Sequence, residues 1–280
     1  MEDGSSSECD RVYALLLRQA AQLSMKRRKN ISLYVHQTGR ADAASIVFLH
    51  GLGLSGAMWQ PQFERLPDFH CLAPDLPEHG KSADLGPLTL KDASKQVADV
   101  IRTYTPNGRA HVVGLSLGGT VAVRMLLDVP EVIDHVMISG TAARLDPIFA
   151  NFNMMMGFLH SDQLAQLIFM QSNIPQQYHH LVLEGVRTVK PAAFHHFSQE
   201  VTQIELPHQV HVPMLITVGQ NETFVVQQAA REMNSTILGA KGLVVPLVGH
   251  IWNLEAPDLF TDTVRSWVTD TPLPPTFRAL

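Results

Sequence analysis

The sequence has few cysteines, no long apolar run and no excess of positive charge. The two cysteines among its 280 residues, Cys9 and Cys71, cannot form a structural zinc site by themselves, and we expect no disulfide between them. The apolar residues 14–17 are interrupted by Arg18, so this run is too short to cross a membrane. The acidic residues 1–4 do not resemble a secretory signal. The composition therefore favours a cytoplasmic location.

The formal net charge of −5 argues against nucleic acid as a partner, because such partners usually require a clustered basic surface. The basic run at residues 26–29 is interpreted as a solvated flank rather than a patch for anionic surfaces. Residues 1–10 have the composition of a disordered tail, and residues 11–24 have the apolar spacing of a short helix. We treat residues 1–30 as an N-terminal tail and short helix, with Met25 as an alternative translation start.

Strand-like and helix-like patterns alternate from residue 31 onward. Continuous apolar runs are typical of strands that are covered on both faces. The expected strands are residues 31–36, 45–50, 70–74, 110–114, 133–139, 214–219 and 243–248. The expected helices are residues 90–104, 118–127, 225–233 and 255–268. The alternation predicts an α/β fold, a mostly parallel sheet with helices on both faces, formed by residues 31–140 and 208–280.

Residues 141–207 interrupt this alternation, because they contain helical patterns and no good strand. The helical patterns cover residues 149–159, 162–170, 175–189 and 192–204. An all-helical insertion after a strand predicts a cap, or lid, over the edge of the sheet. The segment is rich in methionine and phenylalanine, which either form an ordinary core or face a ligand pocket.

The strongest chemical motif is Gly114-Leu115-Ser116-Leu117-Gly118, which follows an expected strand and opens an expected helix. This G-x-S-x-G pattern is typical of a nucleophilic serine on a tight turn between a strand and a helix. The glycines leave room for the turn, and the N-terminus of the helix favours developing negative charge. We predict Ser116 as the nucleophile; the alternative is an incidental serine in a glycine-rich turn.

A serine hydroxyl requires a base, and the base requires an acid to orient it. His250 follows the last expected strand, and this position selects it among 14 histidines. Glu222 lies in the turn after the expected strand 214–219, so the chain order is Ser116, Glu222, His250. The alternative is that Glu222 only begins the next helix.

The negative oxygen that forms during acyl transfer requires two hydrogen-bond donors. We expect one donor to be the backbone N–H of Leu117, directly after the nucleophile. The second is expected from the loop His50-Gly51-Leu52-Gly53, with the N–H of Leu52 as the best candidate. Its neighbouring glycines let the backbone approach a substrate closely.

Four segments together resemble the α/β-hydrolase family over nearly all of residues 31–270. They are the His50-Gly51 loop, Asp75-Leu76-Pro77-Glu78-His79-Gly80-Lys81-Ser82, the turn at Ser116 and the Gly249-His250 pair. The resemblance implies the fold of that family, a cap domain at residues 141–207 and structural roles for Asp75 and His79. Most members have aspartate at the position of Glu222. Asp146 is a second candidate for the acid, because some lipases of the family place theirs near that point.

The resemblance also narrows the chemistry. Carbon–carbon bond hydrolases of the family usually have asparagine where this chain has Leu115, and haloalkane dehalogenases and epoxide hydrolases use aspartate in place of Ser116. We therefore expect a carboxylic-ester hydrolase that acts on a small to medium, partly apolar ester and needs no metal or organic cofactor. The alternatives are a lactonase, with Arg187 or Lys190 holding a substrate carboxylate, and a slow-turnover ligand receptor or signalling protein on the same fold.

Overall fold

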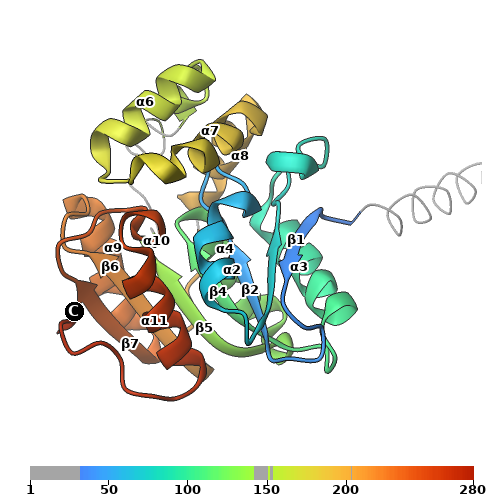
Figure 1. Cartoon of the computed structure of the whole chain (residues 1–280), viewed down its shortest axis with the longest axis vertical. Coiled ribbons are helices and arrows are strands. Elements are labelled where there is room, and N and C mark those ends of the chain that lie inside the picture. The colour runs from blue at the N-terminus through green and yellow to red at the C-terminus, as the bar shows by residue number, and fades with distance from the viewer. Residues whose placement is uncertain (1–31, 142–150, 152–153, 203) are drawn as a thin grey trace, which may run out of the picture. The chain divides into compact units, whose positions relative to one another are not determined.

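The structure, a computed structural model, describes residues 32–141, 151, 154–202 and 204–280 (Figure 1). The expected tail and helix at residues 1–30 lie outside the described residues, and so does Asp146. The α/β class is confirmed: the described chain forms a mostly parallel sheet with helices on both faces.

The sheet of the described residues has eight strands in the order β1-β3-β2-β4-β5-β6-β7-β8. The strands are β1 Val35–Thr38, β2 Ser45–Leu49, β3 His70–Pro74, β4 Ala110–Leu115, β5 Ile133–Ser139, β6 Gln209–Gly219, β7 Leu238–Val245 and β8 Arg278–Ala279. The edge strands β1 and β8 pair antiparallel with their neighbours, and the other pairs are parallel. The carboxyl ends of the parallel strands therefore meet at one edge of the sheet, where open α/β sheets bind their ligands.

The helices lie between the strands in sequence. They are η1 Gly56–Trp59, α2 Gln60–Arg65, η2 Gly80–Ser82, α3 Leu90–Tyr104, α4 Leu117–Asp128, η3 Pro130–Val132, α6 Ser161–Gln171, η4 Gln176–Tyr178, α7 His179–Thr188, α8 Pro191–Val201, α9 Phe224–Thr236, α10 Trp252–Glu255 and α11 Pro257–Val268. Figure 1 shows α2 and α11 side by side in front of the sheet. Between β5 and β6, the described residues of α6, α7 and α8 (yellow to gold) gather at one end of the sheet.

Two apolar clusters cover the two faces of the sheet. Alternate residues of a strand point to opposite faces, and β2 divides accordingly. Val47 and Leu49 join the cluster that contains buried residues of α3, α4 and α9. Ile46 and Phe48 join the cluster that contains buried residues of η1, α10 and α11. The continuous apolar strands of the sequence are therefore covered on both sides.

Several boundaries differ from the predictions. Strand β1 begins at Val35 rather than at residue 31, and β7 begins five residues earlier than expected, because pairing with a neighbouring strand and not apolar content decides where these strands begin. The final helix is divided into α10 and α11, since Pro257 stands in the first turn of α11. Helix α2 and strand β8 were not predicted.

Among the described residues, no helix is long and apolar enough to span a membrane.

Candidate active site

Ser116 lies between the end of β4 and the start of α4, on a sharp turn. Its backbone has φ 54° and ψ −116°, a conformation that residues with side chains rarely adopt. The N–H of Ser116 donates to the carbonyl oxygen of Ser139, at the end of the adjacent strand β5, over 2.9 Å. Backbone strain of this kind often accompanies functional residues, and here it lifts one serine above the carboxyl edge of the sheet.

Glycines make this turn possible. A Cβ atom at Gly114 would overlap the backbone of Gly118, and a Cβ atom at Gly118 would overlap the carbonyl of Leu49 in β2. A Cβ atom at Gly119 would overlap the hydroxyl of Thr141. Each of the three positions therefore excludes a side chain, and the sequence motif has a steric explanation at every glycine.

His250 and Glu222 form a direct hydrogen bond, with 2.8 Å between Nδ1 and Oε1. Because a carboxylate oxygen only accepts, Nδ1 carries the hydrogen and Nε2 is left as an acceptor. The Glu222 side chain is 2% exposed and that of His250 is 39% exposed. The glutamate is thus buried, whereas the imidazole remains accessible to a ligand.

Gly140 connects this pair to the serine turn. It directly follows Ser139, whose carbonyl accepts the N–H of Ser116, and a Cβ atom on Gly140 would lie 3.0 Å from Nδ1 of His250 and 2.8 Å from Oε1 of Glu222. The carboxyl end of β5 therefore touches both the turn that carries Ser116 and the His250–Glu222 pair. The structure brings the predicted residues to one place.

The pKa of His250 results from opposing effects. Burial lowers it, but the charge and hydrogen bond of Glu222 and the charge of Glu255 outweigh burial, so the pKa is raised above its ordinary value. The imidazolium that forms when a base accepts a proton is therefore stabilised at this position.

The loop that carries His250 is held by contacts that the sequence analysis did not identify. Oε2 of Glu255 accepts from the N–H of Gly249 over 3.0 Å, and Nε1–H of Trp252 donates to the hydroxyl of Ser139 over 2.6 Å. Glu255 stands in the short segment after His250, but no local pattern indicates that its side chain turns back toward residue 249.

The loop His50–Gly53 lies against Ser116, since a Cβ atom on Gly51 would be 3.6 Å from Cβ of Ser116. No described residue accepts a hydrogen bond from the N–H of Leu52 or of Leu117. Both amides, which the sequence analysis selected as oxyanion donors, are free of protein partners within the described chain.

Two buried histidines, His79 and His50, hold this loop in place. The N–H of Gly53 donates to Nε2 of His79 over 3.2 Å, and Nδ1–H of His79 donates to the carbonyl of Pro77. Burial, with the nearby His50 ring, lowers the pKa of His79 to about 3. His79 is therefore neutral and serves as a fixed acceptor for the loop.

His50, the first residue of the loop, connects the loop to Leu76. Its Nε2 accepts from the N–H of Leu76 over 2.9 Å, while Nδ1–H donates to the carbonyl of Gly51. Burial lowers the pKa of His50 as well.

Asp75 accepts from the N–H groups of Gly56 and Lys81, each over 2.7 Å. These contacts agree with structural roles for Asp75 and His79.

Apolar side chains of the helical segment between β5 and β6 cover the loop. A Cβ atom on Gly53 would lie 3.2 Å from Cζ of Phe194 in α8 and 3.8 Å from Cδ2 of Leu164 in α6.

Arg187 and Lys190, the cations considered for a substrate carboxylate, form exposed ion pairs, with Asp162 over 3.4 Å and with Asp84 over 3.1 Å. Neither cation contacts a predicted site residue in these pairs.

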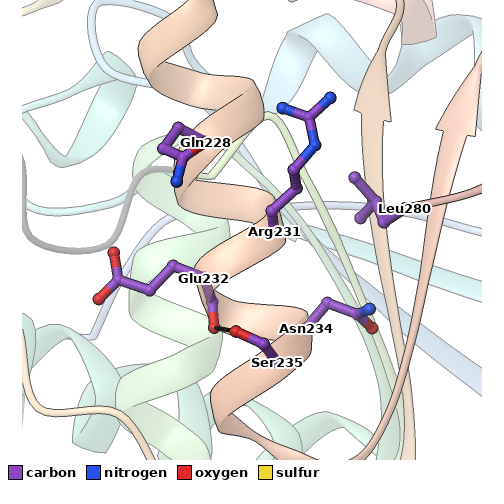
Figure 2. A pocket seen from close by; sticks show the side chains of 6 residues that line it. All are labelled: Gln228, Arg231, Glu232, Asn234, Ser235 and Leu280. Carbon is purple, nitrogen blue, oxygen red and sulfur yellow. Dashed lines mark hydrogen bonds between the residues drawn. The ribbon is translucent and has the colours of Figure 1, made fainter.

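A separate hollow lies along α9, beside the C-terminal residue (Figure 2). Its lining residues are Gln228, Arg231, Glu232, Asn234, Ser235 and Leu280. None of them is a predicted site residue, so this hollow is not the site at Ser116.

Among the described residues, no three histidine, cysteine, aspartate or glutamate side chains are grouped as a metal site would require.

Comparisons with known proteins match most of the chain. The model of the "Alpha/beta hydrolase family" matches residues 46–263. A carboxylesterase of Bacillus subtilis is 28% identical over 250 residues, which cover 84% of this chain and 83% of that protein. An "AB hydrolase superfamily protein" of Gibberella zeae is 25% identical over 260 residues, 84% of each chain. The crystal structure of an enol-lactonase from Burkholderia xenovorans LB400 has a TM-score of 0.73 at 24% identity, covering 85% of this chain and 96% of that one.

Proposed function

Because the chain belongs to the alpha/beta hydrolase family, we propose that it hydrolyses carboxylic esters with Ser116 as nucleophile, His250 as base and Glu222 as the orienting acid. The observation that carries the proposal is the 2.8 Å hydrogen bond from His250 Nδ1 to Glu222 Oε1, beside the strained turn of Ser116. A histidine oriented by a buried carboxylate next to a lifted serine is the arrangement that acyl transfer requires.

In the first half-reaction, Oγ of Ser116 attacks the carbonyl carbon of the ester while Nε2 of His250 takes the hydroxyl proton. The N–H groups of Leu52 and Leu117 donate to the oxygen that becomes negative. The imidazolium is stabilised by Glu222 and then returns the proton to the leaving alcohol. An acyl group remains bound to Ser116.

In the second half-reaction, water attacks the acyl carbon and His250 accepts a proton from it. The same two amides stabilise the second tetrahedral intermediate. As it collapses, the bond between the acyl carbon and Oγ of Ser116 breaks, His250 returns the proton to Oγ, and the carboxylic acid is released. A lactone follows the same steps, except that the leaving alcohol stays attached to the acyl chain, so lactones belong in the same substrate panel.

The substrate is proposed to be a small to medium ester with an apolar group. Phe194 and Leu164 of the proposed cap, residues 141–207, lie over the loop that carries the Leu52 amide. Apolar walls of this kind favour an acyl or alcohol group without charge. A cytoplasmic location remains a prediction from composition alone, and fractionation of cells that express the chain would test it.

The test of this function is turnover with p-nitrophenyl esters of short acyl chains. Ser116→Ala should remove nearly all activity, because binding and oxyanion donors cannot replace the nucleophile. A fluorophosphonate should label the parent protein at Ser116 and leave the alanine variant unlabelled. Wild-type rates in the alanine variant would refute the mechanism, and ligand binding without turnover in the parent would favour a receptor.

A further inference from the structure

Glu78 has an unusual backbone conformation away from the triad. Its φ is 66°, in the left-handed region that favours glycine, and the residue is only 7% exposed. A buried glutamate in this region costs free energy twice, through backbone strain and through loss of hydration. Such a residue persists where its neighbours hold it, so its contacts indicate what it does.

The contacts of Glu78 reach the helical segment between β5 and β6. Its Oε2 accepts from Nδ1–H of His196 in α8 over 2.8 Å and from the N–H of Leu88 over 3.1 Å. Its backbone carbonyl accepts from the N–H of Lys190, the residue before α8, over 2.8 Å. One residue therefore binds α8 both at its N-terminus and at its middle.

The residue that follows Glu78 holds the loop beside the nucleophile. His79 accepts the N–H of Gly53, which adjoins the proposed oxyanion donor Leu52. Phe194 of α8, which stands two residues before His196, also lies against Gly53. Helix α8 thus meets this loop directly through Phe194 and indirectly through Glu78 and His79.

We propose that Glu78 is a positioning residue for ester hydrolysis: through His196 and His79 it sets helix α8 and the Leu52 loop relative to each other, so that the Leu52 N–H points at the developing oxyanion. The inference rests on the proposed function and adds a residue to it. Glu78 does not touch the reacting atoms.

A second ion pair between the same parts of the chain provides a matched control. Lys190 pairs with Asp84 over 3.1 Å, but the side chain of Asp84 is 95% exposed. Exposed pairs contribute little, and within the described chain Asp84 forms no hydrogen bond or ion pair with the Leu52 loop. Asp84→Asn removes one acidic charge near α8 without changing the contacts of Glu78.

The experiment compares Glu78→Gly, Glu78→Gln, His196→Ala and Asp84→Asn with the parent. Glycine relieves the strain at position 78 and removes the carboxylate, so folding should survive. We expect Glu78→Gly and His196→Ala to lower kcat for p-nitrophenyl acetate by about tenfold, because a small displacement of an oxyanion donor weakens the transition state more than the substrate complex. KM should change less than about twofold by the same reasoning. Asp84→Asn should match the parent.

A second measurement reports on the oxyanion site itself. A trifluoromethyl ketone adds to Ser116 and places its negative oxygen between the donor amides, so its inhibition constant should rise with the loss of kcat. Glu78→Gln keeps an acceptor oxygen for His196 and Leu88 and should recover most of both values. The double variant Glu78→Gly, His196→Ala should be no worse than either single variant.

The inference fails if Glu78→Gly and His196→Ala keep the kcat and inhibitor affinity of the parent, or if their effects add. It also fails if they lower the thermal midpoint alone, since that is the result of a purely structural tether. Should Glu78→Gly not fold, His196→Ala decides by the same criteria. Activity that survives in Ser116→Ala would instead refute the proposed function, so the two failures are distinguishable.

Discussion

Glu222 reaches His250 with a side chain one methylene longer than aspartate, and almost all of that chain is buried. Its carboxylate is what keeps the pKa of His250 raised, since burial alone would lower it. The glutamate thus has two effects on one imidazole: it fixes the tautomer through the hydrogen bond, and it stabilises the cation through its charge. The two effects can be separated by experiment.

We predict that Glu222→Gln lowers kcat by about a hundredfold or more, by analogy with the replacement of the triad aspartate by asparagine in serine proteases. The acid limb of the pH profile of kcat/KM should also move to lower pH, because the charge that raises the pKa of His250 is lost while burial remains. Steady-state kinetics between pH 5 and pH 9 would measure both, at roughly the range where histidine titrates.

The control is Asp146→Asn, at the second candidate for the acid. We expect it to keep nearly the activity of the parent. If the two variants give the reverse result, the acid is Asp146 and Glu222 only stands in the turn before α9. If neither variant loses activity, His250 acts without a charged partner.

Gly185 of helix α7 packs against the loop beside Ser116. A Cβ atom on Gly185 would lie 2.6 Å from Cα of Leu54 and 3.1 Å from the carbonyl oxygen of Gly53. Both neighbours are backbone atoms, which cannot rotate away as a side chain can. Helix propensity and packing therefore oppose each other at this residue, since alanine favours a helix by about 1 kcal/mol over glycine.

We predict that packing outweighs propensity and that Gly185→Ala destabilises the protein by about 1–3 kcal/mol, the usual cost of overpacking. Activity should fall as well, because the strain is transmitted to the loop that carries the Leu52 amide. Urea unfolding and turnover of p-nitrophenyl acetate would measure the two effects. The control is Glu184→Ala on the exposed side of α7; an equal loss in both variants, or a gain of stability in Gly185→Ala, would contradict the prediction.

Across the whole molecule, buried histidines couple stability to pH. Burial lowers the pKa of His79 to about 3 and, with the charge of the neighbouring His135, that of His111 to about 4; burial also lowers that of His50. Below about pH 6.5, the ordinary histidine pKa, the unfolded chain binds protons that the folded chain does not bind. Their contribution to stability is therefore present at neutral pH and is lost as the pH falls.

We predict that the free energy of unfolding decreases between pH 6.5 and pH 4.5 by roughly 1.4 kcal/mol per pH unit for each histidine that stays neutral in the folded state. His250 should oppose this slope near pH 6.5, because its folded pKa is raised, and should leave the slope unchanged well below that pH, where both states are protonated. Urea unfolding at several pH values would measure the slope. His111→Gln should make it shallower, and a stability independent of pH in this range would contradict the prediction.

Elements with local patterns could be predicted from the amino-acid sequence alone. Helix α3 and strand β3 have the predicted bounds, because periodicity and continuous apolar runs depend on neighbouring residues. The turn at Ser116 could be predicted for the same reason, since the G-x-S-x-G pattern spans five consecutive residues. The edge strands were not, because pairing with another strand decides where they begin.

Contacts between residues far apart in the sequence depend instead on how the chain packs. Glu222 and His250 are 28 positions apart, and Glu78 and His196 are 118 positions apart. Chain order and family resemblance suggested the first pair, whereas nothing in the sequence suggested the second. A hydrogen bond across such separations depends on how the intervening strands and helices pack, and that packing results from the summed burial of many side chains rather than from a pattern at either residue.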